Sequence, residues 1–233
     1  MKIALVGYGK MGKIIDVIAT ERGHEVVARL NETPTSANLN NPDVVIEFSQ
    51  PEVAFNNIAS CLALGIPVVC GTTGWLDRKS EVEQMAEEKG TAFLYGSNFS
   101  LGVNLFFALN EKLAALMRPF GEYGVQLEEI HHTHKKDAPS GTAISLAEGI
   151  LKHDDRFSGW KLDQTQGDRL GIVALREDEV PGTHSVYYRS EVDEIEIKHT
   201  AFNRNGFALG AVVAAEWIKG KQGVFSMKDV LGV

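Results

Sequence analysis

The sequence contains little cysteine and proline, and it lacks a long apolar segment. Cys61 and Cys70 form neither a Cys-x-x-Cys motif nor a secreted disulfide framework, so we expect two buried, reduced thiols. Seven prolines and a hydrophobic fraction of 44% exclude collagen-like and disordered chains. No apolar run approaches the ~20 residues of a membrane-spanning helix, and the opening MKIALVGYG lacks the apolar region of a signal peptide. We therefore expect a soluble, cytoplasmic protein that does not bind membranes.

Basic residues are outnumbered by acidic ones. The chain has 23 lysines and arginines against 31 aspartates and glutamates, for a net charge of −8. This charge argues against nucleic acid as a partner, although a local basic pocket can still hold a phosphate. A chain of 233 residues has room for one or two domains with a core that needs no disulfide.

The first hundred residues alternate short β-branched, apolar runs with helix-like stretches. Strands are expected at 2–6, 24–30, 43–48, 67–70 and 91–95, and helices at 12–22, 52–64 and 80–89. Strands that alternate with helices predict right-handed crossovers and a parallel sheet. This part of the chain therefore predicts a Rossmann-type, doubly wound sheet.

After Ser97 the pattern changes to longer, alternating strands. We expect a helix at 103–116 with Leu105, Leu109, Leu113 and Leu116 along one face, strands at 125–134, 171–175, 183–190 and 193–200, and helices at 140–153 and 207–218. Such strands favour a mixed open sheet covered by helices on one face. The predicted class is α/β with an added α+β domain. Residues 1–101 and 206–233 would bind a dinucleotide, and residues 102–205 would bind substrate and form the oligomer.

The motif GYGKMG directly follows the first expected strand and opens a helix. Gly7 would allow the tight turn, Gly9 a close approach of a pyrophosphate, and Gly12 close packing of helix and strand. The helix N-terminus would supply N–H groups to the phosphates, with Lys10 and Lys13 beside it. The alternative is a purely structural glycine turn.

The end of the second strand should lie beside the adenine ribose. An acidic residue there favours the 2′-hydroxyl of NAD, and an arginine favours the 2′-phosphate of NADP. Arg29, Asn31 and Glu32 are the candidates, and any of them can also be an ordinary surface residue. Glu32 lies 20 residues after Gly12, so we expect NADH to be used at least as well as NADPH.

Two further loops, GTTG at 71–74 and GSNFS at 96–100, follow the fourth and fifth strands. Ligands of doubly wound sheets lie beyond the carboxyl ends of the strands. Both loops are therefore expected to line the cofactor cleft, although each also reads as an ordinary polar turn.

The densest group of reactive side chains lies in EIHHTHKKDAPSGTA, residues 129–143. It places His131, His132, His134, Lys135 and Lys136 within six positions. If the strand continues through 134, His132 and His134 point one way and His131 and Thr133 the other. Ser140 is a natural helix N-cap, and the N–H groups after it form an anion site. Histidine beside such a site can donate a proton near neutral pH.

Two other interpretations of this segment stay open. His132 and His134 fit a zinc site, but no third ligand is evident, and we expect no metal. A structural histidine cluster without catalysis is the second alternative.

GYGKMG, GTTG, SNFSLGVN and HHTHKKDAPSGTA, in this order, resemble the 4-hydroxy-tetrahydrodipicolinate reductase (dihydrodipicolinate reductase) family of bacterial lysine and diaminopimelate biosynthesis. The resemblance spans essentially the whole chain, including the closing HTAFNRNGFALGA. It implies a Rossmann domain, a mixed-sheet domain that builds a homotetramer, and reduction of a cyclic dicarboxylate by NADH or NADPH.

The resemblance also implies roles for single residues. His131 would be the catalytic acid/base and Lys135 the proton donor. The substrate-binding residues would be His132, Ser140, Gly141 and Thr142, of which His132, Gly141 and Thr142 match the substrate-carboxylate site. The implied cofactor contacts are Gly7, Tyr8, Gly9, Lys10, Met11, Gly12, Asn31, Glu32, Gly71, Thr72, Thr73, Gly96, Ser97, Asn98 and Phe99. Many members carry an arginine after the acidic position, where this chain has Asn31-Glu32 with Arg29 earlier, and the stretch between Leu30 and Asp43 is short.

Two competing functions remain at this point. One is another NAD(P)-dependent reductase of a small carboxylate, in which Cys70 would be proposed as a nucleophile although no base is identified for it. The other is a non-catalytic NAD-sensing protein, which needs the glycine loop but not the histidine-lysine cluster.

Overall fold

The computed structural model describes residues 1–203 and 205–233, and the chain divides into two compact units. Unit 1 comprises Met1–Leu101 and Asn205–Val233, and unit 2 comprises Gly102–Arg204. The sequence placed the second boundary one residue later, at 205/206. The functions predicted for the two parts stay predictions here.

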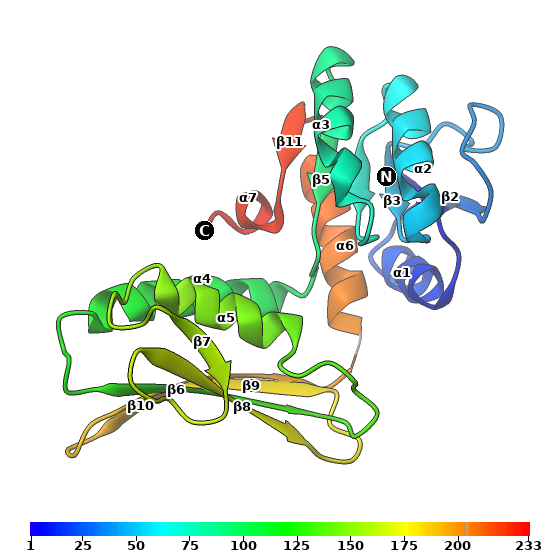
Figure 1. The fold of residues 1–233 in the computed structure, drawn as a ribbon. Helices are drawn as coiled ribbons and strands as arrows, with labels where there is room; N and C mark the ends of the chain where they lie inside the picture. Colours follow the sequence, from blue (N-terminus) through cyan, green and yellow to red (C-terminus); the bar gives the residue numbers. More distant parts are fainter. Residues whose placement is uncertain (204) are drawn as a thin grey trace. The chain divides into compact units, whose positions relative to one another are not determined.

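Unit 1 is built on a parallel sheet of six strands (Figure 1). Its order is β11-β5-β4-β3-β1-β2, with every neighbouring pair parallel. The strands are β1 Lys2–Val6, β2 Glu25–Leu30, β3 Val44–Glu47, β4 Val68–Cys70, β5 Ala92–Tyr95 and β11 Gly223–Phe225. The helices are α1 Lys10–Glu21, α2 Pro51–Ala63, α3 Lys79–Glu88, α6 Asn205–Ile218 and α7 Met227–Leu231, with a short 3-10 turn at Leu76–Arg78.

Helices cover both faces of this sheet because the strands are apolar on both sides. Ile3 and Leu5 pack in one core with Ile15 of α1 and the alanine-rich face of α6. Ala4 and Val6 point the other way, into a second core formed with α2 and α3. The doubly wound architecture predicted from the sequence is confirmed.

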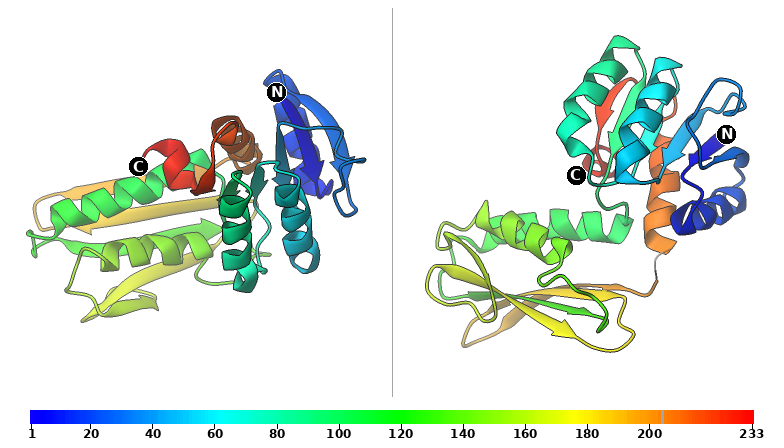
Figure 2. Two further views of the ribbon diagram at one scale, coloured as in Figure 1. Left: turned by 90° about the horizontal axis from the view of Figure 1, so that it is seen from above. Right: turned by 45° about the vertical axis from the view of Figure 1, so that its right-hand side comes forward.

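Unit 2 is a mixed five-stranded sheet with two helices on one face (Figure 2). The order is β10-β9-β6-β8-β7, antiparallel at β10/β9 and β9/β6 and parallel at β6/β8 and β8/β7. The elements are α4 Leu101–Met117, β6 Gly124–His131, α5 Gly141–Leu151, β7 Gly159–Leu162, β8 Arg169–Arg176, β9 Gly182–Arg189 and β10 Glu194–Ala201. The predicted mixed open sheet is therefore confirmed.

Some details of unit 2 differ from the expectation. The strand predicted at 125–134 ends at His131, so His132 and His134 lie in the following turn, and the predicted alternation of their side chains is wrong. On α4, the leucine stripe is mostly outside the core: Leu105, Leu109 and Leu116 are 48%, 52% and 58% exposed. The helix instead buries Phe106 and Ala114 against the sheet, because these residues share the face next to β6 and β9.

Two further observations bear on the sequence-based expectations. Cys61 and Cys70 are free and buried, as predicted. None of the described helices is long and apolar enough to cross a membrane.

Candidate active site

Two of the three motif glycines are required by backbone packing in unit 1. Gly7 has φ +90°, and a Cβ there would lie 2.0 Å from the Phe48 carbonyl oxygen. A Cβ on Gly12 would lie 2.4 Å from the Gly7 carbonyl oxygen. At Gly9, by contrast, a Cβ would meet nothing within 4 Å. The turn is thus closed against the protein at Gly7 and Gly12 and open at Gly9, where the sequence predicts that a pyrophosphate approaches.

The open side of this turn leads to the start of helix α1. Gly9 is the N-cap, and it has no side chain to cap the first N–H groups. These N–H groups and the helix dipole form a site of partial positive charge. The residues present therefore fit the pyrophosphate of a dinucleotide.

Two adjoining hollows, of about 500 and 350 Å³, flank the glycine turn. They share Gly9, Phe48 and Ser49. Of the predicted cofactor residues, the hollows bring together Gly7, Gly9, Lys10, Met11, Asn31, Glu32, Gly71, Thr72 and Thr73. Ser49 and Asn57, which also line the larger hollow, were not predicted.

A buried carboxylate that the sequence analysis missed joins two loops of this cleft. Glu47, at the end of β3, is fully buried, and Thr72 Oγ1 donates to its Oε2 at 2.7 Å. The Ser49 hydroxyl donates to Oε1 of the same carboxylate. The Ser49 N–H in turn donates to Thr72 Oγ1 at 2.8 Å. Glu47 thereby fixes the loop after β3 to the loop after β4.

The loop at 96–99 is only partly placed for cofactor binding. Phe99 is 2% exposed and packs in the unit 1 core with its ring 5.6 Å from that of Phe48. Because the Phe99 side chain is buried in the core, a cofactor could contact this residue only through its backbone. Asn98 Oδ1 accepts from the Ser100 N–H at 2.9 Å, which stabilises the turn. Gly96 and Ser97 remain predictions.

At the end of β2, the three predicted ribose candidates have different environments. Asn31 Oδ1 accepts from the Tyr8 N–H at 2.8 Å and so connects to the glycine turn. Glu32 is exposed and accepts from Asn38 at 3.3 Å. Arg29 is bound to Asp16 of α1. Glu32 is therefore the charged group at this edge of the cleft that has the fewest competing contacts.

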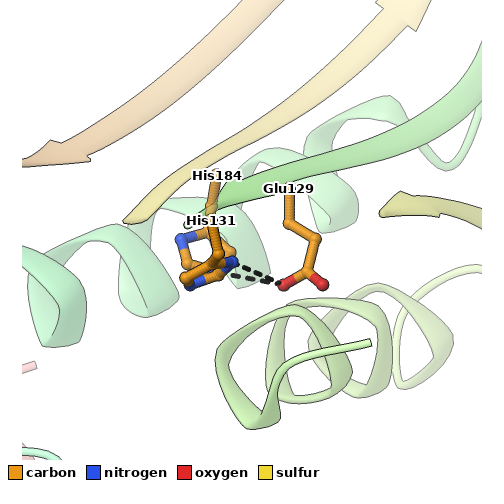
Figure 3. A group of neighbouring side chains, drawn as sticks. All are labelled: Glu129, His131 and His184. Atoms are coloured by element: carbon orange, nitrogen blue, oxygen red, sulfur yellow. Dashed lines mark ion pairs between the residues drawn. The ribbon is translucent and has the colours of Figure 1, made fainter. Parts of the chain in front are cut away.

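In unit 2, the reactive segment is organised around a second buried carboxylate, Glu129 (Figure 3). Along β6, residues 125, 127, 129 and 131 all point inward, so Glu129 and His131 share the buried face. His131 Nδ1 lies 3.3 Å from Glu129 Oε2, and His184 Nε2, from the adjacent strand β9, lies 3.6 Å from the same oxygen. The two imidazole rings meet edge to face with centroids 5.0 Å apart.

The Glu129 carboxylate also binds the start of helix α5. The Ser140 N–H lies 3.1 Å from each Glu129 oxygen. Ser140 Oγ lies 3.0 Å from His184 Nε2 and accepts from the Ala143 N–H at 3.2 Å, which makes Ser140 the helix N-cap as predicted. Gly141 and Thr142 follow in the first turn, where N–H groups have no partner within the helix.

Burial would raise the pKa of Glu129, but its contacts with His131, His184 and Ser140 outweigh burial and hold that pKa well below its usual range. Burial foremost lowers the pKa of His184. The carboxylate is therefore anionic, and His184 is neutral at neutral pH.

Arg176 connects this carboxylate to the loop that carries Lys135. Its Nη2 lies 3.2 Å from Glu129 Oε1 and donates to the Asp137 carbonyl oxygen at 2.5 Å. Lys135 Nζ contacts both Asp137 carboxylate oxygens at 2.8 Å, and Lys135 foremost lowers the pKa of Asp137. His131 and Lys135 thus belong to one network, with Glu129 and Arg176 between them.

His132 and His134, the pair considered as a zinc site, are not part of the one group of possible metal ligands among the described residues. The rings of His132 and His134 are 6.3 Å apart and tilted by 47°. Glu129, His131 and His184 do lie close enough to surround a cation. However, the guanidinium of Arg176 and the Ser140 N–H already occupy the carboxylate, and a second positive charge beside Arg176 is unfavourable. We interpret this group as a hydrogen-bonding and ion-pair network.

Comparisons with known proteins agree with this geometry. Dihydrodipicolinate reductase family models match residues 1–99 (N-terminus) and 102–231 (C-terminus). A 4-hydroxy-tetrahydrodipicolinate reductase from Christiangramia forsetii (strain DSM 17595 / CGMCC 1.15422 / KT0803) is 52% identical over 233 residues, covering 99% of this chain and 98% of the relative.

Two solved structures are similar in fold. A dipicolinate-bound dihydrodipicolinate reductase from Paenisporosarcina sp. TG-14 has a TM-score of 0.79 and 21% identity, with 97% of both chains covered. A probable dehydrogenase from Thermotoga maritima has a TM-score of 0.61 and 11% identity, with 99% of this chain and 92% of that one covered. The family models and the 52% identical relative show that the chain belongs to the dihydrodipicolinate reductase family.

Proposed function

We propose that this protein reduces 4-hydroxy-tetrahydrodipicolinate to tetrahydrodipicolinate with NADH or NADPH, in the biosynthesis of lysine and diaminopimelate. The observation that carries the proposal is the arrangement of segment 129–142. It brings a buried histidine, a lysine and the N-capped start of α5 into one network around Glu129. The 52% identical relative is named 4-hydroxy-tetrahydrodipicolinate reductase. In this proposal, the site residues of unit 2 supply the proton donors and the carboxylate-binding groups that the reaction needs.

The substrate is a cyclic dicarboxylate, and the start of α5 suits one of its carboxylates. The N–H groups of Gly141 and Thr142 lie in the first helical turn, and the Thr142 hydroxyl is a further donor. Ser140 positions this turn through its contacts with Glu129 and His184. His132, half-buried in the turn after β6, is the proposed additional donor to a carboxylate.

Loss of water from the substrate gives a conjugated system that accepts two electrons at C4. The bound nicotinamide supplies these electrons as a hydride. The resulting enamine then needs a proton at C3. His131 or Lys135 donates that proton, and the cationic donor also stabilises the negative charge that reduction delivers. After the loss of water, the product has therefore gained one hydride at C4 and one proton at C3, so the step balances.

Two further properties belong to the proposal. We expect a homotetramer assembled through unit 2, where β10 is an edge strand of the sheet. We also expect the protein to act in the cytoplasm, without a metal, a membrane or nucleic acid as partner.

The test is the oxidation of NADH and NADPH, followed by absorbance, with freshly prepared 4-hydroxy-tetrahydrodipicolinate. Turnover that depends on this substrate supports the proposal. Small semialdehydes and 2-oxo acids serve as competing substrates, and their preferential reduction would assign the protein to a different reductase activity. Binding of NADH without reduction of any of these substrates would indicate a sensor.

A further inference from the structure

Glu129 is not among the residues expected to touch substrate, but its carboxylate lies at the centre of the contacts in this site. Glu129 is 0% exposed and lies within 3.6 Å of polar atoms from four other residues of unit 2. These are His131 on its own strand, Arg176 on β8, His184 on β9 and Ser140 at the start of α5. Burying a carboxylate is costly unless such partners compensate it. The partners here are the proposed proton donor and the cap of the proposed carboxylate site.

We propose that Glu129 is a positioning residue, which holds His131 in the orientation and charge state of a proton donor and at the same time fixes the Ser140–Thr142 turn that receives the substrate carboxylate. This inference rests on the proposed function for the identity of the substrate. The relation between Glu129 and His131 is independent of the proposed function, because it can be measured without any substrate.

The first part of the argument concerns the imidazole of His131. Its Nδ1 is buried and has no hydrogen-bond partner of good geometry among the described residues, but it lies 3.3 Å from Glu129 Oε2. An anion at that position favours a proton on Nδ1 and leaves Nε2 to face a reactant. It also favours the imidazolium over the neutral ring. Glu129 therefore prepares His131 to lose a proton through Nε2.

The second part concerns the helix start. Both Glu129 oxygens lie 3.1 Å from the Ser140 N–H, and His184 bridges from Glu129 Oε2 to Ser140 Oγ. These contacts fix the Ser140 backbone directly before Gly141 and Thr142. The distance between the donor histidine and the carboxylate-binding N–H groups is thereby set by one side chain.

Other charges near His131 must be considered in a pH experiment. They are Glu129 on its own strand, Arg176 on β8, His184 on β9, and Lys135 and Asp137 in the loop that follows. Arg176, Lys135 and a protonated His184 oppose a charge on His131, whereas Glu129 favours it. Replacement of Glu129 by glutamine removes the favourable charge and leaves the others in place.

The primary experiment is an NMR titration of His131 in the full-length protein without ligand, with the signal assigned by its absence in His131→Gln. In Glu129→Gln, we expect the His131 ring signal to change at lower pH than in the wild type, because the neutral amide no longer favours the imidazolium. Glu129→Asp keeps the charge and should bring the change back close to its wild-type pH. Glu148→Gln is the control, because it removes the same charge from the exposed side of α5.

The second readout is activity. A proton donor works only when protonated, so the fall of kcat/KM at high pH should move to lower pH in Glu129→Gln by the same amount as the change of the His131 ring signal. Ser140→Ala, which loses the hydroxyl but keeps the N–H, should raise KM for the dicarboxylate and leave that pH limb in place. A shifted pH limb reports the effect of Glu129 on His131, whereas a raised KM reports the ordering of the carboxylate-binding turn.

The proposal is overturned if His131 titrates in folded Glu129→Gln as it does in the wild type. If Glu129→Gln does not fold, Arg176→Met tests the relation from the other side. It removes the cation that competes with His131 for Glu129, so the His131 ring signal should change at higher pH than in the wild type, and a change at lower pH or no difference would overturn the proposal. A shifted His131 titration with no reductase activity in the wild type would instead reject the proposed substrate and keep the positioning role.

Discussion

Arg29 and Asp16 form a two-point ion pair between β2 and α1. Arg29 Nε lies 2.6 Å from Asp16 Oδ2, and Arg29 Nη2 lies 2.8 Å from Oδ1. The Tyr8 hydroxyl donates to the same Oδ2 at 2.5 Å. Arg29 foremost holds the pKa of Asp16 below its usual range. The guanidinium beside the expected ribose site is therefore already bound to a carboxylate, and the Tyr8 hydroxyl of the glycine turn contacts that same carboxylate.

This pairing leads to a prediction about the cofactor. With Arg29 engaged, Glu32 is the charged group at the end of β2 that faces the larger hollow, and a carboxylate there repels a 2′-phosphate. We expect NADH to be used at least as well as NADPH, and Glu32→Arg to shift kcat/KM toward NADPH. Glu25→Arg, at the opposite end of β2, should leave the ratio unchanged. A wild-type preference for NADPH of tenfold or more, about 1.4 kcal/mol, would contradict this interpretation of the cleft.

The roles assigned to His131 and Lys135 predict a kinetic effect without loss of fold. Each of His131→Gln and Lys135→Ala should lower kcat by at least ~10²-fold, which is the usual contribution of a general acid. Circular dichroism should show the wild-type fold. Lys136→Ala is the matched control, because this neighbour is exposed and has no assigned role. Near-normal turnover of both variants would show that another group donates the proton.

The carboxylate site at the start of α5 predicts a specific inhibitor. Pyridine-2,6-dicarboxylate is planar and carries two carboxylates at the spacing of the substrate. We expect it to compete with the substrate and not with NADH, because the N–H groups of Gly141 and Thr142 lie in unit 2 while the glycine turn lies in unit 1. Steady-state inhibition patterns decide the matter. Competition with NADH alone would place the anion in the cofactor cleft instead.

Assembly is the next prediction. Strand β10 is one of the two edge strands of the unit 2 sheet, and Ile195 on this strand is 38% exposed. Exposed sheet edges are usually covered. We expect a homotetramer with residues 183–200 at the interface, and Ile195→Asp should weaken it. Multi-angle light scattering at micromolar concentration is the measurement, and a monomeric wild type would rule this assembly out.

Much of the fold could be predicted because the periodicity of the sequence is regular. The first strands are uniformly apolar and alternate with helical stretches, so the doubly wound sheet follows. β7 and β11 were missed because GWKL and GVF each begin with glycine and contain only two apolar residues, whereas the equally short β3, β4 and β5 contain at least three. The strand before the histidines was predicted too long because polar residues after His131 still fit an alternating pattern.

The site was predicted only where residues cluster in sequence. GYGKMG and the histidine-lysine segment are visible as motifs, whereas Glu47, His184 and Arg176 are brought to their sites by the topology of the sheets. Glu129 did carry a signal. It continues the inward-facing series of Val125 and Leu127, so alternation alone places a carboxylate in the core, where it needs partners.

The buried network at Glu47 supports a last prediction, which concerns cofactor binding. It tests whether the Thr72 hydroxyl orders the cofactor cleft. Thr72 Oγ1 donates to Glu47 Oε2 and accepts from the Ser49 N–H, so it joins the loops after β3 and β4. In Thr72→Val, both partners lose this hydrogen bond while the side-chain shape is kept, at a cost of about 1–3 kcal/mol for a buried polar group. Part of this free-energy cost should appear as a less ordered arrangement of the two loops that line the cleft.

We therefore expect Thr72→Val to raise KM for NADH by about tenfold and to leave the affinity for pyridine-2,6-dicarboxylate unchanged, because the proposed dicarboxylate site belongs to unit 2. Thr72→Ser retains the hydroxyl and should restore the wild-type KM. Thermal unfolding measured alongside separates a local effect on the cleft from a general loss of stability. If Thr72→Val binds NADH as the wild type does, or if Thr72→Ser fails to rescue it, the hydroxyl does not order the cofactor cleft.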